Sequence, residues 1–443
     1  MNDDALSCDL VVIGAGMAGM TAAARAADRG ARVVVIEKAP RIGGSALMSG
    51  GILWTSSSDE RMQLYGGGSR LLGNVVRRAY PEAISWLKRQ GIKMSGARKV
   101  LSGFGYQIDI VEYLEECRRT VERTEGYVVC GTSVQSLLKG RSGEIVGVRT
   151  VHSDGAVDVH APYTLLATGG YQGSAELRAR YIHENARNML VRANPHSSGD
   201  AIELALAVGA QTSEANRGFY GHLVSRSPSW GDERFFSLLA QYHSEHGLLF
   251  NENGYRFCDE STGDHNNAWW TVFQPNARAL LLWDRRVQDR YATASSIPGQ
   301  PGHDKFNVAM DHGGEGRICR DHADLLAFAN SVGFDGERLI ESLADFNIRA
   351  ETAWETLVPP RTEACRPLNQ PDFYALVVYP SITYTFGGLT IDANTRVLGP
   401  EAVPITGLLA AGADAGDVYG QGYAGGLAQA MSLGIVAAAT AGW

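Results

Sequence analysis

Several features that mark whole classes of protein are missing from this chain of 443 residues. Its six cysteines are scattered, and because no C-x-x-C or C-x-x-C-H motif occurs, iron–sulfur clusters, attached haem and a zinc ribbon are unsupported. No run of Lys or Arg exceeds two residues, and 40 basic residues against 48 acidic ones give a formal net charge of −8. Nucleic acid and anionic membrane surfaces are therefore unexpected partners.

Neither a leader nor a membrane-spanning segment is expected from the sequence. The first four residues are acidic overall and run straight into a predicted strand, which leaves no room for a cleavable apolar leader. The longest apolar stretch, 425–442, contains Gln429 and many Ala and Gly residues, so we expect a buried helix there rather than a membrane span. A cytoplasmic location is the resulting expectation.

The most informative pattern stands near the amino terminus. An apolar strand over 9–13 leads into three glycines with G-x-G-x-x-G spacing, an alanine-rich helix runs to Gly30, and a second strand ends in a carboxylate. This order predicts a site for a dinucleotide pyrophosphate. The residues expected to hold the cofactor here are Gly14, Gly16, Met17, Ala18, Gly19, Glu37 and Lys38.

Each glycine of the motif has a separate physical task. Gly14 permits the tight exit from the strand, Gly16 lets the backbone approach the pyrophosphate, and Gly19 lets the helix pack against the sheet. The amide groups and the positive end of the helix dipole then face the phosphates. Glu37 can accept hydrogen bonds from ribose hydroxyls and would repel a 2′-phosphate, which disfavours NADP. The alternative is an ordinary glycine-rich turn between a strand and a helix.

Periodicity outlines the elements that follow. Apolar residues recur at helical spacing around 73–90 and 108–123, whereas 128–138, 145–152 and 157–166 have the pattern of strands. The Gly- and Ser-rich segment 42–51 is predicted to be a loop. Between about 216 and 358 the chain is rich in aromatic residues, histidine and asparagine, and Pro359-Pro360 marks a predicted linker.

Three further glycine-rich turns, at 43–51, 167–170 and 411–414, offer more closely approachable backbone than one NAD molecule uses. An extended FAD would pass all of them. The further residues predicted to hold FAD in these turns are Gly43, Gly44, Ser45, Ser49, Gly50, Gly51, Ala167, Thr168, Gly169, Gly412 and Asp414.

With these turns the sequence resembles, over nearly its whole length, the flavoprotein-subunit family of fumarate reductase and succinate dehydrogenase. Its relatives, the 3-ketosteroid Δ1-dehydrogenases and tricarballylate dehydrogenases, are similar as well. The resemblance implies an α/β fold in which residues 1–215 and 359–443 form a Rossmann-like FAD-binding domain. An α+β capping domain, 216–358, is expected to be inserted between these two parts.

The resemblance also implies particular cofactor contacts. The backbone of Val134 would contact adenine, Asp200 lies in a family-like Ser-Gly-Asp-Ala run, and Asp414 stands where the family has a Glu that binds the ribityl hydroxyls. The tail helix, beginning at Gly426, Leu427 and Ala428, would stabilise negative charge on the reduced flavin. Segment 43–51 lacks the His to which some members attach FAD, so non-covalent FAD is expected. Electrons would leave to an external acceptor or to O2.

The substrate positions of the family carry a changed set of residues. The family's substrate arginine falls on Tyr423, its proton-delivering arginine falls on Asp264, a histidine falls on Tyr384, and only His222 is kept. Without the arginines there is no bidentate clamp for a dicarboxylate, so fumarate reduction is not expected. Tyrosines are neutral donors that suit a ketone or enolate oxygen.

These substitutions favour dehydrogenation α,β to the carbonyl of a small, possibly cyclic ketone or keto acid. Tyr423, with Tyr384 as a second donor, would polarise the carbonyl, Asp264 or His265 would remove the α-proton, and the β-hydride would pass to flavin N5. The tyrosines could instead be core residues, and Asp264 and His265 could belong to a solvated turn. An ene-reductase, an oxidase and a flavin-binding protein with decayed chemistry remain alternatives.

Overall fold

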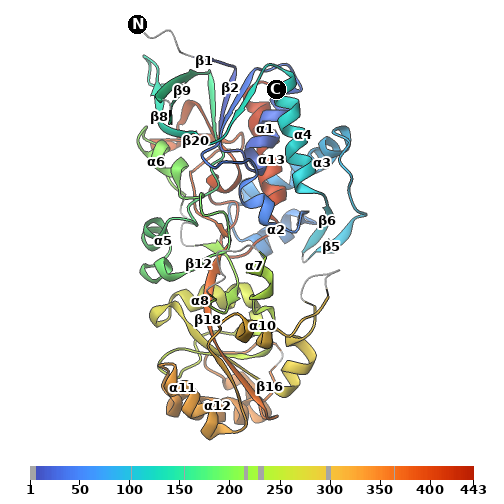
Figure 1. Ribbon diagram of the computed structural model, residues 1–443, viewed down its shortest axis with the longest axis vertical. Helices are drawn as coiled ribbons and strands as arrows, with labels where there is room; N and C mark the ends of the chain where they lie inside the picture. The colour runs from blue at the N-terminus through green and yellow to red at the C-terminus, as the bar shows by residue number, and fades with distance from the viewer. Residues whose placement is uncertain are drawn as a thin grey trace. The chain divides into compact units, whose positions relative to one another are not determined.

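The computed structural model describes residues 6–100, 102–153, 155–213, 218–227, 234–295, 301–363 and 365–443. The chain divides into two compact units (Figure 1). Unit 1 comprises Met1–Leu177, Ala193–Phe219 and Tyr384–Trp443, and unit 2 comprises Arg178–Arg192 and Tyr220–Thr383. The predicted boundary between residues 215 and 216 lies outside the described residues, and the predicted division into domains stays a prediction.

Unit 1 is built on a six-stranded sheet with the order β20-β21-β11-β2-β3-β7. The strands from β21 to β7 are parallel, and β20 runs antiparallel at one edge. Strands β2 (Leu10–Ile13) and β3 (Val33–Ile36) are entirely buried, as expected of short apolar strands in a parallel sheet. The predicted α/β fold with a Rossmann-like first βαβ unit is confirmed.

Unit 1 also contains smaller sheets and several helices. A second sheet has the order β1-β10-β9-β8, and a third has the order β4-β6-β5. The bounds in unit 1 are β1 (Leu6–Ser7), α1 (Met17–Ala27), β4 (Ile52–Ser56), α2 (Asp59–Gly66), α3 (Arg70–Arg89), β5 (Arg98–Val100), β6 (Gly103–Gln107), α4 (Ile110–Arg123), β7 (Tyr127–Val129), β8 (Ser133–Lys139), β9 (Ile145–His152), β10 (Gly155–His160), β11 (Tyr163–Leu166), α6 (Asp200–Leu206), β19 (Tyr384–Thr385), β20 (Arg396–Leu398), β21 (Pro404–Ala410) and α13 (Gly426–Thr440). Helix α5 (Ala175–Tyr181) and strand β13 (Phe219–Tyr220) contain unit boundaries.

Three sequence predictions about elements were wrong in detail. The expected strand 128–138 is two strands, β7 and β8, because the chain turns at Gly131 with a φ of 71°. The expected strand 157–166 is likewise divided into β10 and β11, which belong to different sheets. The expected loop 42–51 contains a short 3-10 helix, Gly44–Met48, which Gly43 enters with a φ of 120°.

Helix α13, which contains the apolar tail, is buried against α1, so two segments from opposite ends of the chain lie side by side (Figure 1). Small residues allow this approach. A Cβ atom on Gly434 would lie 2.6 Å from the carbonyl oxygen of Ala18, closer than atoms can pack. The expectation of a buried tail helix is therefore confirmed.

Unit 2 is organised around β18 (Phe373–Ile382), all ten residues of which are buried. The main path of its sheet is β12-β18-β16-β15, and β14 and β17 also pair with β18. Apolar side chains from these strands and from the helices of the unit form one hydrophobic core. The bounds in unit 2 are β12 (Leu190–Val191), β14 (Leu223–Val224), α7 (Phe235–Leu238), β15 (Leu248–Phe250), α8 (Asp264–Val272), β16 (Ala279–Asp284), α9 (Arg285–Val287), α10 (Lys305–Asp311), β17 (Gly316–Cys319), α11 (His322–Ser331) and α12 (Gly336–Thr352).

Candidate active site

The glycine turn between β2 and α1 has the geometry that its sequence predicts. A Cβ on Gly14 would lie 2.3 Å from the carbonyl oxygen of Ala167, and a Cβ on Gly19 would lie 2.0 Å from the carbonyl oxygen of Gly14. Neither position can hold a side chain. A Cβ on Gly16 would have only the carbonyl oxygen of Gly43 within 4 Å, at 3.9 Å, so the protein itself does not require glycine there.

The start of α1 fits a pyrophosphate. Gly16 is the N-cap, no side chain caps the helix, and its first turn holds no acidic residue, although Met17 and Ala18 are only 4% and 5% exposed. A buried helix start normally needs acceptors for its amide groups. Phosphate oxygens would supply them, and the open space beside Gly16 would admit them.

The segment that begins at Gly43 lies against this helix start. The Gly43 amide donates to the Ala15 carbonyl over 2.8 Å, and a Cβ on Gly44 would lie 3.7 Å from the Gly16 Cα. Ser45 Oγ accepts from the Asn194 amide, and Ser49 Oγ donates to the Ala46 carbonyl. The predicted residues Gly14 to Gly19 and Gly43 to Ser45 are thus brought together within unit 1.

Glu37 follows β3 and is 7% exposed. Its two carboxylate oxygens accept the amide hydrogens of Ala15 and Ala39, each over 2.8 Å. These bonds fix the carboxylate at the glycine turn, and since each oxygen has two lone pairs, acceptor capacity remains for ribose hydroxyls. The ribose contact stays a prediction.

Lys38 and Asp200 contact each other. Lys38 Nζ donates to both carboxylate oxygens of Asp200, over 2.9 and 2.8 Å, and to Ser198 Oγ over 2.7 Å. Asp200 is the first residue of α6. The pair joins the segment after β3 to α6.

Asp414, which is 1% exposed, binds the turn after β11. Its carboxylate accepts from the amides of Thr168, Gly169 and Gly170 and from the Thr168 hydroxyl. Burial raises the pKa of Asp414 to about 6, and these hydrogen bonds oppose the shift. The carboxylate therefore holds two of the predicted FAD turns together, whereas its contact with the ribityl hydroxyls stays a prediction.

The other predicted cofactor residues are spread over unit 1. Val134 lies in β8 opposite Thr150, Gly51 has a φ of 70° before β4, and Gly412 opens a short 3-10 helix after β21. A Cβ on Gly50 would meet no heavy atom within 4 Å, and a Cβ on Gly412 would lie 3.0 Å from the Ala18 Cβ. Leu427 and Ala428 lie in the first turn of α13.

Tyr423 stands just before α13 in unit 1. Its hydroxyl oxygen accepts from the Gly426 amide, the first amide of α13, over 2.6 Å. Its ring lies in an aromatic cluster, with centroids 5.5 Å from Tyr419, 6.0 Å from Tyr384 and 6.2 Å from Trp54. The hydroxyl is therefore held at the positive end of a helix dipole.

Tyr384 has a different environment in the same cluster. Its hydroxyl donates to Gln429 Oε1 over 2.6 Å, and Gln429 Nε2 donates to the Gly412 carbonyl over 3.1 Å. Burial raises the pKa of Tyr384 well above its usual range. The Tyr384 proton is thus directed to Gln429. Sequence reasoning noted Gln429 only as a polar break in an apolar helix, and this break was the signal for its role.

Unit 2 brings together two other predicted catalytic residues. His222 Nδ1 bonds to Asp264 Oδ2, and Asp264 Oδ1 accepts from the Leu223 amide over 3.1 Å. His222 and Asp264 are 6% and 8% exposed. Burial lowers the pKa of His222, and the charge of Asp264 partly opposes this effect. In the part of the chain that the structure describes, His222 Nε2 has no hydrogen-bond partner.

His265 follows Asp264 on α8 and is half-buried. Its ring centroid lies 5.1 Å from that of Tyr220, which itself contacts the His222 ring edge-on at 5.0 Å. The predicted solvated turn is not observed for Asp264, because this residue is buried and begins a helix.

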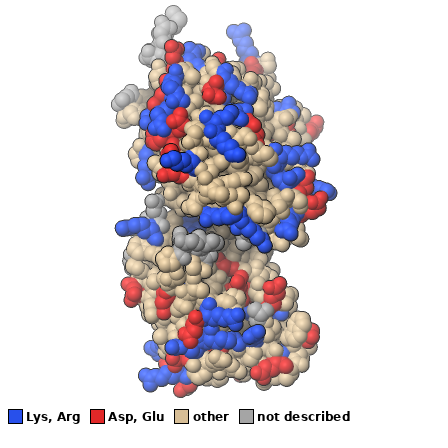
Figure 2. All heavy atoms as spheres, turned by 90° about the vertical axis from the view of Figure 1, so that its right-hand side faces the viewer, with Lys and Arg blue, Asp and Glu red and all other residues tan. Residues whose placement is uncertain are grey.

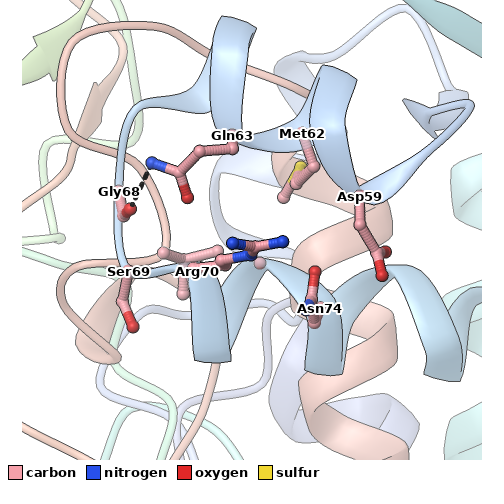
Figure 3. Close-up of a pocket in the computed structure, with 9 residues that line it drawn as sticks. Asp59, Met62, Gln63, Gly68, Ser69, Arg70 and Asn74 are labelled. Carbon is pink, nitrogen blue, oxygen red and sulfur yellow. Dashed lines mark hydrogen bonds between the residues drawn. The ribbon is translucent and has the colours of Figure 1, made fainter.

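A pocket in unit 1 has a lining that includes none of the predicted site residues (Figure 3). It lies between α2 and α3, and Gln63 Nε2 donates to the Gly68 carbonyl at its edge. Its lining residues are Asp59, Met62, Gln63, Gly68, Ser69, Arg70, Gly73, Asn74 and Val418. None of them was predicted to bind substrate or cofactor.

Basic and acidic side chains are interspersed on the face shown in Figure 2, in line with the balanced composition. Among the described residues, no helix has the length and apolarity to cross a membrane, and no three His, Cys, Asp or Glu side chains cluster as metal ligands would.

Known proteins resemble this chain over nearly its full length. The sequence model of a family described as "FAD binding domain" matches residues 9–427. An NADH:fumarate oxidoreductase of Klebsiella pneumoniae (strain 342) is 24% identical over 457 residues, covering 96% of this chain but 46% of that protein. The chain thus spans about half the length of this relative.

Two further similar proteins have names that refer to carbonyl compounds. A 4-oxocyclohex-2-ene-1-carboxylate 5-dehydrogenase of Sinomonas cyclohexanicum is 23% identical over 553 residues, covering 95% of this chain and 90% of that protein. The solved structure of a 3-ketosteroid-delta4-(5alpha)-dehydrogenase from Rhodococcus jostii RHA1, in complex with 4-androstene-3,17-dione, has a TM-score of 0.76 at 19% identity. That comparison covers 100% of this chain and 98% of the other, and it shows the fold alone.

Proposed function

The chain belongs to the FAD binding domain family, and on this premise we propose that it is an FAD-dependent oxidoreductase of CH–CH groups. Its proposed reaction is the desaturation, α,β to the carbonyl, of a small ketone or keto acid. The names of the Sinomonas and Rhodococcus proteins, both dehydrogenases of oxo compounds, support this substrate class. The observation that carries the proposal is the Tyr423 hydroxyl at the start of α13.

The cofactor is FAD, and we propose that it is held without a covalent bond, since segment 43–51 contains no histidine. The uncapped start of α1 and the open space at Gly16 would receive its pyrophosphate, and Glu37 its adenosine ribose. When bound, FAD supplies the hydride acceptor of the reaction. The start of α13, where Gly425 provides no side-chain cap, would face negative charge on the reduced ring.

Tyr423 is the proposed donor to the substrate carbonyl. The Gly426 amide that donates to its oxygen fixes the hydroxyl and strengthens its O–H group as a donor, because linked hydrogen bonds polarise one another. A stronger O–H donor stabilises the enolate oxygen that forms when the α-proton leaves. Tyr384 takes a positioning role instead of the second donor role that the sequence suggested, because its proton is directed to Gln429.

His222 is the proposed base for the α-proton. Asp264 accepts from Nδ1, which leaves Nε2 as the basic nitrogen, and the lowered pKa keeps the ring neutral near pH 7. Asp264, a candidate base in the sequence prediction, becomes the group that orients His222. His265 remains the second candidate for the base.

The reverse reaction, reduction of an activated double bond, is the second candidate function. The name of the Klebsiella relative, a fumarate oxidoreductase that uses NADH, favours it. The electron acceptor would be an external compound or O2, and the proposed location is the cytoplasm. An oxidase and a flavin-binding protein with decayed chemistry are the remaining alternatives.

Two phenylalanine variants test the role of Tyr423. Y423F is expected to slow anaerobic flavin reduction by a cyclic ketone about 10²- to 10³-fold, the usual cost of losing one oxyanion donor. Tyr419, whose hydroxyl donates to the Gly425 carbonyl in the same cluster, offers Y419F as the matched control. Equal rates for Y423F and Y419F would refute the assignment.

A further inference from the structure

Arg192 of unit 2 is held in place by three uncharged groups. Its Nε donates to the Phe236 carbonyl over 3.1 Å, Nη1 donates to Thr383 Oγ1 over 3.2 Å, and Nη2 donates to Tyr242 Oη over 3.2 Å. These acceptors come from α7, from the residue after β18 and from the segment before β15. Three separate segments therefore fix the orientation of one half-buried guanidinium.

No carboxylate compensates the charge of Arg192 within the ranges that the structure describes. Its three hydrogen bonds use three of the five N–H groups and leave one on each terminal nitrogen. Arg256 and Arg361 of the same unit differ, since both pair with the buried carboxylate of Glu260. A fixed guanidinium without a counterion is suited to an anion that arrives from outside.

Arg192 lies beside the residues of the proposed proton transfer. Tyr242, which accepts from Arg192, also contacts the His222 ring edge-on with centroids 4.9 Å apart. The charge of Arg192 also acts to lower the pKa of His222, second to burial among the effects that lower it. The nearby carboxylate of Asp264 is turned toward His222 and the Leu223 amide.

We propose that Arg192 binds a carboxylate group of the substrate, next to His222 in unit 2. This inference rests on the proposed function, because it takes His222 as the base of that reaction. One guanidinium with two remaining N–H groups matches one carboxylate, so the substrate class becomes a cyclic or acyclic oxo monocarboxylate. A dicarboxylate would leave its second acid group without such a partner.

The test compares the FAD-loaded wild type with R192Q, R192K and the control R285Q. Arg285 is an arginine of the same unit whose side chain is 50% exposed. The probes are cyclohexanecarboxylate, which has no ketone, for calorimetric binding, and 4-oxocyclohexanecarboxylate with its methyl ester for flavin reduction. R192Q is expected to weaken binding of the acid about tenfold or more and to raise KM for the oxo acid, with the ester unaffected. R285Q should behave as the wild type.

R192K keeps the positive charge but loses the planar guanidinium with its paired N–H groups, so its loss of acid binding should be intermediate. R192K also carries the test if R192Q does not fold. The inference is overturned if both variants bind the acid as tightly as the wild type, or if acid and ester lose equally. Acetate binding equal to that of cyclohexanecarboxylate would indicate an adventitious ion only and would also overturn it. If the acid binds through Arg192 but no ketone reduces the flavin, the proposed function fails and the carboxylate site stands.

Discussion

Replacing Gly16 by Ala adds one methyl group at the N-cap of α1, where the protein has space for it. The nearest heavy atom to the new Cβ is the Gly43 carbonyl oxygen at 3.9 Å, and the φ of −81° is ordinary for alanine. The stability of the apoprotein should therefore change by less than about 0.5 kcal/mol. The same methyl would occupy the space that the pyrophosphate needs. Overfilling a tight contact costs about 1–3 kcal/mol, which corresponds to about 5- to 150-fold weaker FAD binding.

The assay combines FAD titration of the apoprotein, followed by flavin fluorescence, with thermal unfolding without FAD. Gly96→Ala is the matched control, because a Cβ there meets no heavy atom within 4 Å. Gly19→Ala should behave in the opposite way and destabilise the apoprotein itself, since its Cβ would lie 2.0 Å from the Gly14 carbonyl oxygen. If G16A binds FAD as tightly as G96A does, the pyrophosphate does not lie at the start of α1.

Three other predictions concern buried carboxylates. D264N should slow flavin reduction about 10²- to 10⁴-fold. It should also move the acid limb of the pH profile of this rate to lower pH, because the charge of Asp264 raises the pKa of His222. An unchanged pH profile would contradict the proposed roles of His222 and Asp264. E260Q leaves the guanidinium groups of Arg256 and Arg361 without their completely buried carboxylate partner, so it should lower the free energy of unfolding in urea by about 3–5 kcal/mol. A loss below about 1 kcal/mol would contradict this prediction. Burial raises the pKa of Asp414 from 3.8 to about 6, so the folded state holds this proton more tightly than the unfolded chain does. Stability of the apoprotein should fall, by up to about 3 kcal/mol, as the pH rises from about 4 to 6, and D414N should lack this dependence in pH-dependent urea unfolding; an identical pH dependence in D414N would refute it.

The sequence predicted best what depends on neighbouring residues. The spacing of Gly14, Gly16 and Gly19 encodes a strand exit, an open helix start and a tight helix–strand contact, and the structure shows each of them. Strand ends were predicted less well, because the turn at Gly131 interrupts a stretch whose side chains all suit strands.

Contacts between distant segments could not be predicted from the sequence. His222 follows one short strand and Asp264 begins a helix 42 positions later, so nothing in the local pattern indicates that they bond. The Tyr384 hydroxyl finds its acceptor, Gln429, on α13, 45 positions away. Arg192 lies in a segment without any motif, and its lack of a carboxylate partner is visible only once the surrounding described residues are in place.

The most direct test of the central claim is to mix the FAD-loaded protein with cyclic ketones and oxo acids in the absence of O2. We expect the visible absorbance of the oxidised flavin to bleach and the product to carry two hydrogen atoms fewer, as an α,β-unsaturated carbonyl compound. Bleaching should be about 10²- to 10³-fold slower in Y423F and should keep its rate in Y419F. Flavin that stays oxidised with every ketone and oxo acid, yet is reduced by dithionite, would contradict the account.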